Sequence, residues 1–162
     1  MIVHDDLLKI VTYDPETGLF TWLIRPRQRA CSHIAGTVNS EGYRQICIKQ
    51  KMYKAHRLAW FYIYGEWPGA QLDHINGNKD DNRIANLRLA NYQQNQANSR
   101  TRVTNKLGIK GIYFHKFSKL YHARIMVDGK NLSLGYFKTP EEAHRAYVAG
   151  AKRYFGEFAR AS

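Results

Sequence analysis

An Asp-His pair and two later asparagines have the residue types of a hydrolytic site built around one metal ion. Asp73 and His74 are adjacent, Asn86 lies 12 residues after His74, and Asn95 lies 9 residues further on. A carboxylate and an amide oxygen can share a hard divalent cation. A neutral imidazole beside them can take a proton from water, which then attacks phosphorus. The segment therefore predicts metal-assisted hydrolysis of a phosphodiester.

The composition favours a folded protein that binds a polyanion. Of the 162 residues, 44% are hydrophobic and 13% are aromatic, which is ample for a packed core. The 25 Lys and Arg residues outnumber the 13 Asp and Glu residues and give a formal charge of +12. An excess of this size points to a polyanionic partner.

The positive charge is concentrated in the last third of the chain. Residues 1–55 have eight basic and five acidic side chains, and residues 56–98 have four of each kind. Residues 99–162 have thirteen basic and four acidic side chains, a net charge of +9. Because the predicted hydrolytic segment is neutral, we expect a separate C-terminal module to hold the polyanion.

The cysteines and the N-terminus bear on metal binding and location. Cys31 and Cys47 are far from any second Cys or His at zinc spacing, so no structural zinc is expected. Two isolated thiols and an N-terminus unlike a targeting peptide predict an intracellular, cytoplasmic protein. No apolar run approaches about 18 residues, so no membrane span is expected.

The hydropathy pattern predicts an α+β fold that begins with a small antiparallel β region. Residues 5–12 are weakly helical, and residues 14–18 form a turn rich in Pro and Gly. A buried helix is expected over residues 55–64. Between the turn and this helix, β-prone runs occupy residues 19–24, 34–38, 43–48 and 52–53.

Around the Asp-His pair the order of elements is strand, loop, strand and helix. The strands are expected over 71–75 and 86–89, and the helix is expected from about Tyr92 with Asn91 as its cap. With the preceding helix, the text HRLAW…DHINGNKDDNRIANLR…N resembles the ββα-metal motif of the HNH endonucleases. The match covers about residues 56–98, within a predicted nuclease domain of residues 1–98.

The resemblance implies a role for each of the four residues. His74 is similar to the general base, which must hold a neutral nitrogen at working pH. Asp73 and Asn95 are similar to the ligands of one divalent cation, and their hard oxygens suit Mg²⁺ or Mn²⁺. Asn86 is similar to the residue that holds the His74 loop and imidazole in place. The sequence departs from the family pattern in having Asn95 where a histidine is common.

Several neighbouring side chains have two interpretations. His56 either has a structural role at the start of its helix or lies near the phosphate or the metal. Arg57 and Arg88 either clamp phosphate through their planar forks or are solvated. Asp80 and Asp81 are expected to be solvated loop residues or caps of a helical turn.

Residues 99–108 are basic and lack periodicity, so we expect a linker there and a second domain over 109–162. Asp128-Gly129 between alternating runs indicates a hairpin. Thr139, Pro140 and the acidic residues after them predict a helix that continues to about Phe155. The expected strands of this domain are 111–116, 120–127 and 130–137.

The last fifty residues resemble the apetala-two, or ethylene-response-factor, DNA-binding domain, through the segments GIY, ARI, LGYF and TPEEA. The resemblance implies that the sheet enters the major groove. By alternation Ala123 and Ile125 face the helix, and Arg124 faces outward as the best candidate for a guanine contact. The other expected DNA contacts, among which each lysine either meets phosphate or is solvated, are Arg100, Arg102, Lys110, Tyr113, His115, Lys116, Lys119, His122, Met126, Lys130, Asn131 and Ser133.

Together these features predict a metal-dependent HNH endonuclease that nicks or cleaves double-stranded DNA at chosen sites. It is similar to the homing endonucleases of phages and would act as a monomer or homodimer, in an infected host cell if a phage encodes it. Two other interpretations remain. One is a DNA-binding regulator whose nuclease motif is inactive, and the other is a nonspecific or structure-specific nuclease of repair or packaging.

Overall fold

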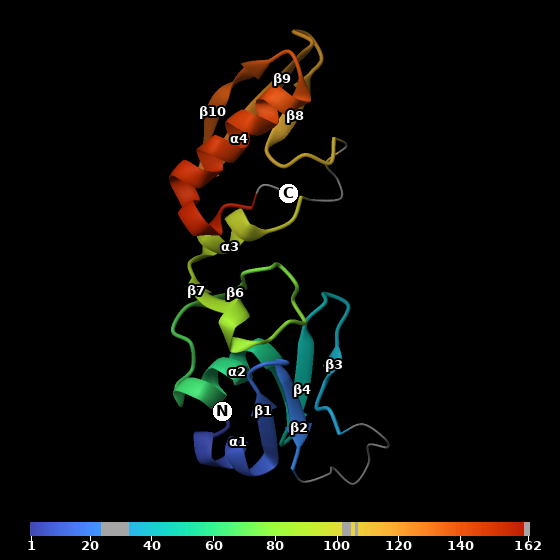
Figure 1. Ribbon diagram of the computed structural model, residues 1–162, viewed down its shortest axis with the longest axis vertical. Helices are drawn as coiled ribbons and strands as arrows, with labels where there is room; N and C mark the ends of the chain where they lie inside the picture. Colours follow the sequence, from blue (N-terminus) through green and yellow to red (C-terminus); the bar gives the residue numbers. More distant parts are fainter. Residues whose placement is uncertain (24–32, 102–104, 106, 161–162) are drawn as a thin grey trace. The chain divides into compact units, whose positions relative to one another are not determined.

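The computed structural model describes residues 1–23, 33–101, 105 and 107–160 (Figure 1). The chain divides into two compact units, Met1–Ala90 and Asn91–Ser162. The positions of the two units relative to each other are not determined. Within the described ranges, no helix is long and apolar enough to cross a membrane.

The first unit consists of short helices and small antiparallel sheets. Strands β1 and β2 form one pair, β3, β4 and β5 form a sheet in that order, and β6 pairs with β7. An isolated bridge between Thr21 and Ile34 joins β2 to the segment that precedes β3. The elements are α1 (His4–Ile10), β1 (Val11–Asp14), β2 (Leu19–Trp22), β3 (Thr37–Val38), β4 (Arg44–Ile48), β5 (Lys51–Lys54), α2 (Ala55–Tyr64), β6 (Gln71–His74), η1 (Ile84–Asn86) and β7 (Leu87–Ala90).

The core of this unit is built around α2. Leu58 of α2 packs with Leu7, Phe20 and Ile46, and all four side chains are fully buried. The helix ends at Gly65, whose φ of 74° lies in the left-handed region. The predicted helix over residues 55–64 is confirmed.

The prediction for the N-terminus is wrong at one end. The helix expected over residues 5–12 ends at Ile10, and Val11–Asp14 form strand β1 instead. Val11 and Tyr13 are buried whereas the residues between and after them are exposed, so this stretch has the period of a strand that pairs with β2. The environment of Cys31 lies outside the described residues.

The second unit is a three-stranded sheet packed on one long helix, as predicted. The sheet order is β10-β9-β8, and α4 packs on the face that holds Ile112, Ala123 and Ile125. Thr139 begins α4 with a capping box, since its side chain accepts from the Glu142 amide. The elements are α3 (Tyr92–Asn98), β8 (Ile112–His115), β9 (Leu120–Val127), β10 (Lys130–Phe137), α4 (Pro140–Phe155) and η2 (Gly156–Phe158).

Helix α3 belongs to this second unit. Its carbonyl end accepts hydrogen bonds from the Lys110 ammonium, through the backbone oxygens of Ala97 and Ser99. The Arg160 amide also donates to the Ala97 carbonyl, at 3.4 Å. The compact units therefore divide at Ala90, whereas the predicted domains divide at residues 98 and 109. The division into a nuclease domain over residues 1–98, a linker over 99–108 and a DNA-binding domain over 109–162 stays a prediction.

Gly18 supports the loop between β6 and β7. Its φ is +72°, and a Cβ there would lie 2.6 Å from the Asn82 carbonyl carbon and still closer to the Arg83 nitrogen. Gly65 has a similar φ of +74° but has nothing within 4 Å of its Cβ position. Gly65 is therefore a matched control for the effect of φ alone.

We expect Gly18→Ala to lower the free energy of unfolding by about 2 kcal/mol more than Gly65→Ala. Both changes force a left-handed backbone on alanine, but only the first inserts a methyl group into packed backbone. Urea unfolding followed by circular dichroism measures the difference. Equal losses in the two variants would show that Gly18 does not support the loop.

Candidate active site

Asp73 and His74 lie at the end of β6 and are both buried. In the β6–β7 ladder, Asp73 lies opposite Arg88 and His74 lies opposite Leu87. The exposed fraction is 4% for Asp73 and 5% for His74. Since adjacent strand residues face opposite sides, both sides of β6 are covered at this point. The predicted base and the predicted metal ligand are therefore held by the same strand end.

Asp73 forms a buried ion pair with Arg88. The Arg88 Nε and Nη2 atoms are each 2.9 Å from Oδ2 of Asp73, so both bonds end on the same carboxylate oxygen. The Arg88 side chain is only 13% exposed. The interpretation of Arg88 as a solvated residue is therefore wrong, and it neutralises part of the buried charge of the predicted metal ligand.

The environment of His74 favours its neutral form. Burial lowers the pKa of His74 despite a contact with the Asn82 side chain. This contact joins Nε2 of His74 to Oδ1 of Asn82 at 3.5 Å, while Nδ2 of Asn82 donates to the Asp80 carbonyl at 2.9 Å. Because an amide oxygen only accepts, this contact favours the tautomer with the hydrogen on Nε2, in which Nδ1 is the basic nitrogen.

His56 lies directly beside His74. The two ring centroids are 5.0 Å apart and the rings are nearly perpendicular. His56 is 6% exposed, and its buried Nδ1 has no hydrogen-bond partner among the described residues. Burial lowers the pKa of His56 to about 3, with a smaller contribution from His74. The structure thus places a neutral His56 against the predicted base.

Asn86 ties together the loop that follows His74. Its Oδ1 accepts from the Asn76 amide at 3.0 Å, and its Nδ2 donates to the Asn76 side chain and to the Asp81 carbonyl at 3.1 and 2.8 Å. The residue is 8% exposed, so these bonds satisfy a buried amide. The hydrogen bonds attach Asn86 to the loop, and its role toward the imidazole stays a prediction.

Asn82 is a buried residue of the site that the sequence analysis missed. Its side chain is fully buried, and its backbone carbonyl accepts a 2.8 Å hydrogen bond from the Tyr13 hydroxyl. Asn82 thus connects the β6–β7 loop to β1 and also contacts His74. Asparagine in a Gly- and Asp-rich segment is typical of turns, so its sequence context contains no sign of burial.

Both acidic residues of the loop form ion pairs, and Asp81 also accepts from the Arg83 amide directly before η1. Asp80 accepts from Nε and Nη2 of Arg44 at 2.8 and 2.9 Å, one bond to each oxygen. Asp81 accepts from Arg83 in the same two-bond manner. These bonds are the main reason that the pKa of Asp81 is lowered to about 2. Of the predicted supporting residues, Arg57 donates to the Pro68 carbonyl at 3.4 Å.

The fourth predicted residue, Asn95, lies on α3 in the second unit. Its role as a ligand beside Asp73 therefore stays a prediction. In the described ranges, no group of three or more His, Cys, Asp and Glu side chains could hold a metal ion. The predicted pair of one carboxylate and one amide oxygen suits a hard divalent cation that keeps several waters.

The open face of the C-terminal sheet displays aromatic and polar side chains. Ala123 and Ile125 are buried toward α4, as the alternation predicted, and Met126 is 58% exposed. The Arg124 guanidinium lies 3.8 Å from the centre of the Tyr113 ring. His122 stacks on Tyr136 with ring centroids 4.3 Å apart. Their contact with DNA stays a prediction.

Two exposed aromatic residues of this unit were not predicted from the sequence. Tyr136 is 54% exposed, and Phe117, in the turn between β8 and β9, is 96% exposed. Among the other predicted DNA contacts, Lys110 is half-buried and Arg102 lies outside the described residues. The remaining predicted contacts are exposed, namely Arg100, His115, Lys116, Lys119, Lys130, Asn131 and Ser133.

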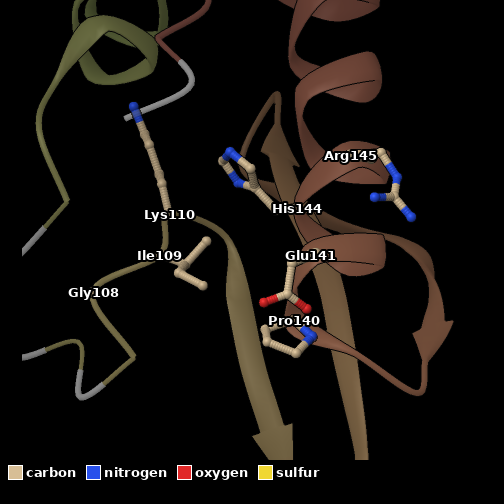
Figure 2. Close-up of a pocket in the computed structure, with 7 residues that line it drawn as sticks. All are labelled: Gly108, Ile109, Lys110, Pro140, Glu141, His144 and Arg145. Atoms are coloured by element: carbon tan, nitrogen blue, oxygen red, sulfur yellow. The ribbon is translucent and has the colours of Figure 1, made fainter.

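A cavity of about 400 Å³ lies in the second unit, between the start of β8 and α4 (Figure 2). None of the four predicted catalytic and metal-binding residues lines it. His144 in its wall has a buried Nδ1 without a hydrogen-bond partner in the described ranges. The lining residues are Gly108, Ile109, Lys110, Pro140, Glu141, His144 and Arg145.

The burial of His56 has a measurable effect on stability. Its folded pKa of about 3 lies below its ordinary value of 6.5, so the unfolded chain binds more protons below pH 6.5. The stability that the neutral His56 contributes is complete above pH 6.5 and is lost as the pH falls toward 3.

We expect the free energy of unfolding to fall when the pH is lowered from about 7.5 to about 5. The fall should be about 2 kcal/mol larger in the wild type than in His56→Gln, which lacks the titrating imidazole. Urea unfolding of both proteins at the two pH values measures this difference. The comparison within each protein removes any constant loss caused by the substitution. Identical pH dependence would mean that His56 is not buried in its neutral form.

Comparison with known proteins supports the interpretation of the central segment. The model of an HNH endonuclease family matches residues 53–97. The uncharacterized HNH endonuclease L560 of Acanthamoeba polyphaga mimivirus is 38% identical over 106 residues, which are 64% of this chain and 54% of that protein. The chain thus spans about half the length of this relative.

A second relative is covered more fully. Protein 3.8 of Escherichia phage T7 is 33% identical over 85 residues, which are 50% of this chain and 70% of the phage protein. A solved structure described as DNA binding and cleavage by the HNH homing endonuclease I-HmuI is 20% identical, with a TM-score of 0.43. The alignment covers 76% of this chain and 71% of that one.

The predicted resemblance to the HNH motif over residues 56–98 is confirmed by the family match, whereas the likeness of the C-terminal domain to the apetala-two family stays a prediction. The matched residues include α2, the β6–β7 hairpin and its loop, and nearly all of α3. Asp73, His74, Asn86 and Asn95 all lie within them. Residues 53–97 are therefore an HNH endonuclease domain.

Proposed function

We propose that this protein is a metal-dependent DNA endonuclease that hydrolyses phosphodiester bonds of duplex DNA at selected sites. The observation that supports this most strongly is the buried, neutral His74 next to Asp73 at the end of β6, within the matched HNH segment. A neutral imidazole whose second nitrogen is engaged by an amide has the form that a general base requires.

In the proposed reaction, His74 accepts a proton from the attacking water at Nδ1. Its contact with Asn82 holds the hydrogen on Nε2 and thereby sets the tautomer. Asn86 holds the loop after His74 through bonds to Asn76 and the Asp81 carbonyl. Catalysis of this kind depends on position, because the water must lie between the imidazole and phosphorus.

Asp73 and Asn95 would hold the divalent cation, Mg²⁺ or Mn²⁺. When bound, the cation supplies charge stabilisation to the pentacovalent phosphorus and the leaving oxygen. Arg88 pairs with Oδ2 of Asp73, so it would orient this carboxylate and offset its charge. Asn95 begins the second turn of α3, on a helix whose start is fixed by the Asn91 capping box.

The second unit would supply DNA binding through the open face of its sheet. Residues 99–162 carry the net charge of +9, and α4 covers the opposite face. An exposed antiparallel sheet can enter the major groove, where Arg124 would read guanine, in the manner of apetala-two domains. Lys110 is not part of this proposed surface, because its ammonium donates to α3 carbonyls.

One HNH motif contains one set of catalytic residues and is expected to cut one DNA strand. A monomer would therefore nick duplex DNA, and a double-strand break would need a dimer or two successive events.

Cleavage at selected sites is typical of homing endonucleases. A basic sheet without sequence preference would instead produce scattered nicks.

We expect His74→Ala to reduce nicking of plasmid DNA by at least about 100-fold, because it removes the general base. Cleavage by the wild type should require Mg²⁺ or Mn²⁺ and stop when the cation is chelated with EDTA. Gel analysis of supercoiled and relaxed plasmid measures both effects. His33→Ala is the control, since this histidine is exposed in the same unit.

Two outcomes would contradict the proposed chemistry. Full activity of His74→Ala would show that another group removes the proton. Intact plasmid with the wild type in both cations would favour a DNA-binding regulator with an inactive nuclease motif.

We expect Arg124→Ala to relax sequence preference at one base pair of the cleavage site, at a cost of about 1–3 kcal/mol in discrimination. Arg145→Ala is the matched control, because Arg145 is exposed on α4, which covers the other face of the sheet. Sequencing of cut ends from a randomised DNA library measures the preference. Unchanged preference in Arg124→Ala would exclude the sheet face as the source of site choice.

A further inference from the structure

A second cluster of side chains lies beside His74 in the first unit, and the proposed hydrolysis does not use it. We call Tyr43, Lys54 and Lys79 the Tyr43 cluster. The Lys54 ammonium lies 4.3 Å from the centre of the Tyr43 ring, and the Lys79 ammonium lies 4.7 Å from it. Two positive charges thus converge on one aromatic ring.

The cluster is close to the predicted base. The centroid of the Tyr43 ring is 6.0 Å from that of His74 and 5.4 Å from that of His56. Lys54 directly precedes α2, and Lys79 lies in the loop that follows β6. The two ammonium groups therefore come from both chain segments that flank the buried histidines.

The backbone around the cluster is held firmly. The Tyr43 amide donates to the Asn39 side chain at 2.9 Å, and the Asn39 amide donates to the Tyr43 carbonyl at 2.9 Å. The two-bond ion pair of Arg44 and Asp80 joins the residues that follow Tyr43 and Lys79 in the chain. Tyr43 and Lys79 are thus neighbours because the Arg44–Asp80 ion pair joins their segments, and their contact does not depend on the long lysine side chain alone.

The charges of the two lysines are not balanced locally. Neither Lys54 nor Lys79 forms an ion pair in the described part of the chain, although Lys79 donates to the Glu41 carbonyl at 3.0 Å. Lys54 comes from residues 1–55, which have a net charge of +3, and Lys79 comes from residues 56–98, which are neutral as a whole. The Glu41 and Asp73 carboxylates act on Tyr43 from a distance, but neither forms an ion pair with Lys54 or Lys79. Converging ammonium groups without an ion-paired carboxylate favour an anionic ligand.

We propose that the Tyr43 cluster is a binding site for a DNA backbone phosphate next to the scissile one. This inference rests on the proposed nuclease function and extends it. The Lys54 and Lys79 ammonium groups contact the phosphate oxygens, while the Tyr43 ring keeps both side chains in place. Binding at this point fixes the strand relative to His74, so that water approaches phosphorus in line with the leaving oxygen. The lysines are positioning residues, since they touch a phosphate that does not react.

The test compares Lys54→Met and Lys79→Met with the control Lys51→Met. Methionine keeps much of the side-chain length that packs against Tyr43, and Lys51 is an exposed lysine at the start of β5, the strand that ends with Lys54. On unmodified duplex DNA we expect kcat/KM to fall about tenfold for each cluster variant, as for loss of one charge-assisted bond. The control should retain the wild-type value. Thermal unfolding of each variant verifies that the fold is intact.

The contacted phosphate is then identified with neutral substitutions in the DNA. A set of duplexes has a single methylphosphonate at successive positions around the mapped cut. At one position, the wild type should lose activity. On that duplex the two cluster variants should be as active as the wild type, because the phosphate charge that Lys54 and Lys79 recognise is absent. Cluster variants that behave like Lys51→Met, or that keep their tenfold loss at every methylphosphonate position, would overturn the proposal.

DNA binding provides a readout that does not depend on cleavage. Fluorescence anisotropy at several salt concentrations should show a shallower salt dependence for the Lys54→Met, Lys79→Met double variant, by about two units of the log–log slope. If the wild type cuts no DNA but the double variant still has the shallower salt dependence, the proposed nuclease function is contradicted and the phosphate site is supported. An unchanged slope would contradict the phosphate site.

Discussion

The loop between β6 and β7 must bury polar groups beside the predicted base, and the rest of the site depends on how these groups are satisfied. Asn82 is fully buried and Asn86 nearly so, and each uses its side-chain amide to hold neighbouring backbone. An unsatisfied buried amide would cost about 1–3 kcal/mol. Two such residues therefore select one loop conformation from the many that its Gly- and Asn-rich sequence permits.

The support of this loop extends to distant parts of the first unit. Tyr13 of β1 donates to the Asn82 carbonyl, and Gly18 leaves room for the backbone at the same point. Arg44, the first residue of β4, binds Asp80 through Nε and Nη2 of its guanidinium. The N-terminal β region thus acts as a scaffold for the His74 loop. This explains why a neutral catalytic segment is preceded by strands that contain none of the predicted catalytic residues.

Much of the fold could be predicted from local sequence patterns. The helix over residues 55–64 and the strands over residues 120–127 and 130–137 have clear periodicity and recognisable ends, and the structure confirms their bounds. The α+β class and the packing of the last sheet on one helix followed from the same patterns. Strand β1 was missed because four residues are too few to distinguish a strand from the end of a weak helix.

The surroundings of the candidate site could not be predicted in the same way. Tyr43 and Lys79 are 36 residues apart in the chain, as are Arg44 and Asp80, and no local pattern indicates that these segments meet. The burial of His56, Arg88 and Asn82 likewise follows from tertiary packing. Residue identity and spacing indicated the chemistry of Asp73 and His74, whereas the groups that set their charge state and position became apparent only in the structure.

The central claim is that this site uses His74 to activate water for attack on a DNA phosphate. A single-turnover reaction in water enriched in ¹⁸O tests it, with mass spectrometry of the terminal phosphate of the cleaved strand. We expect one ¹⁸O atom in that phosphate, formed at the wild-type rate only when His74 is present. Cleaved DNA whose terminal phosphate contains no ¹⁸O would contradict activation of water by His74, because a group other than water would then have attacked phosphorus.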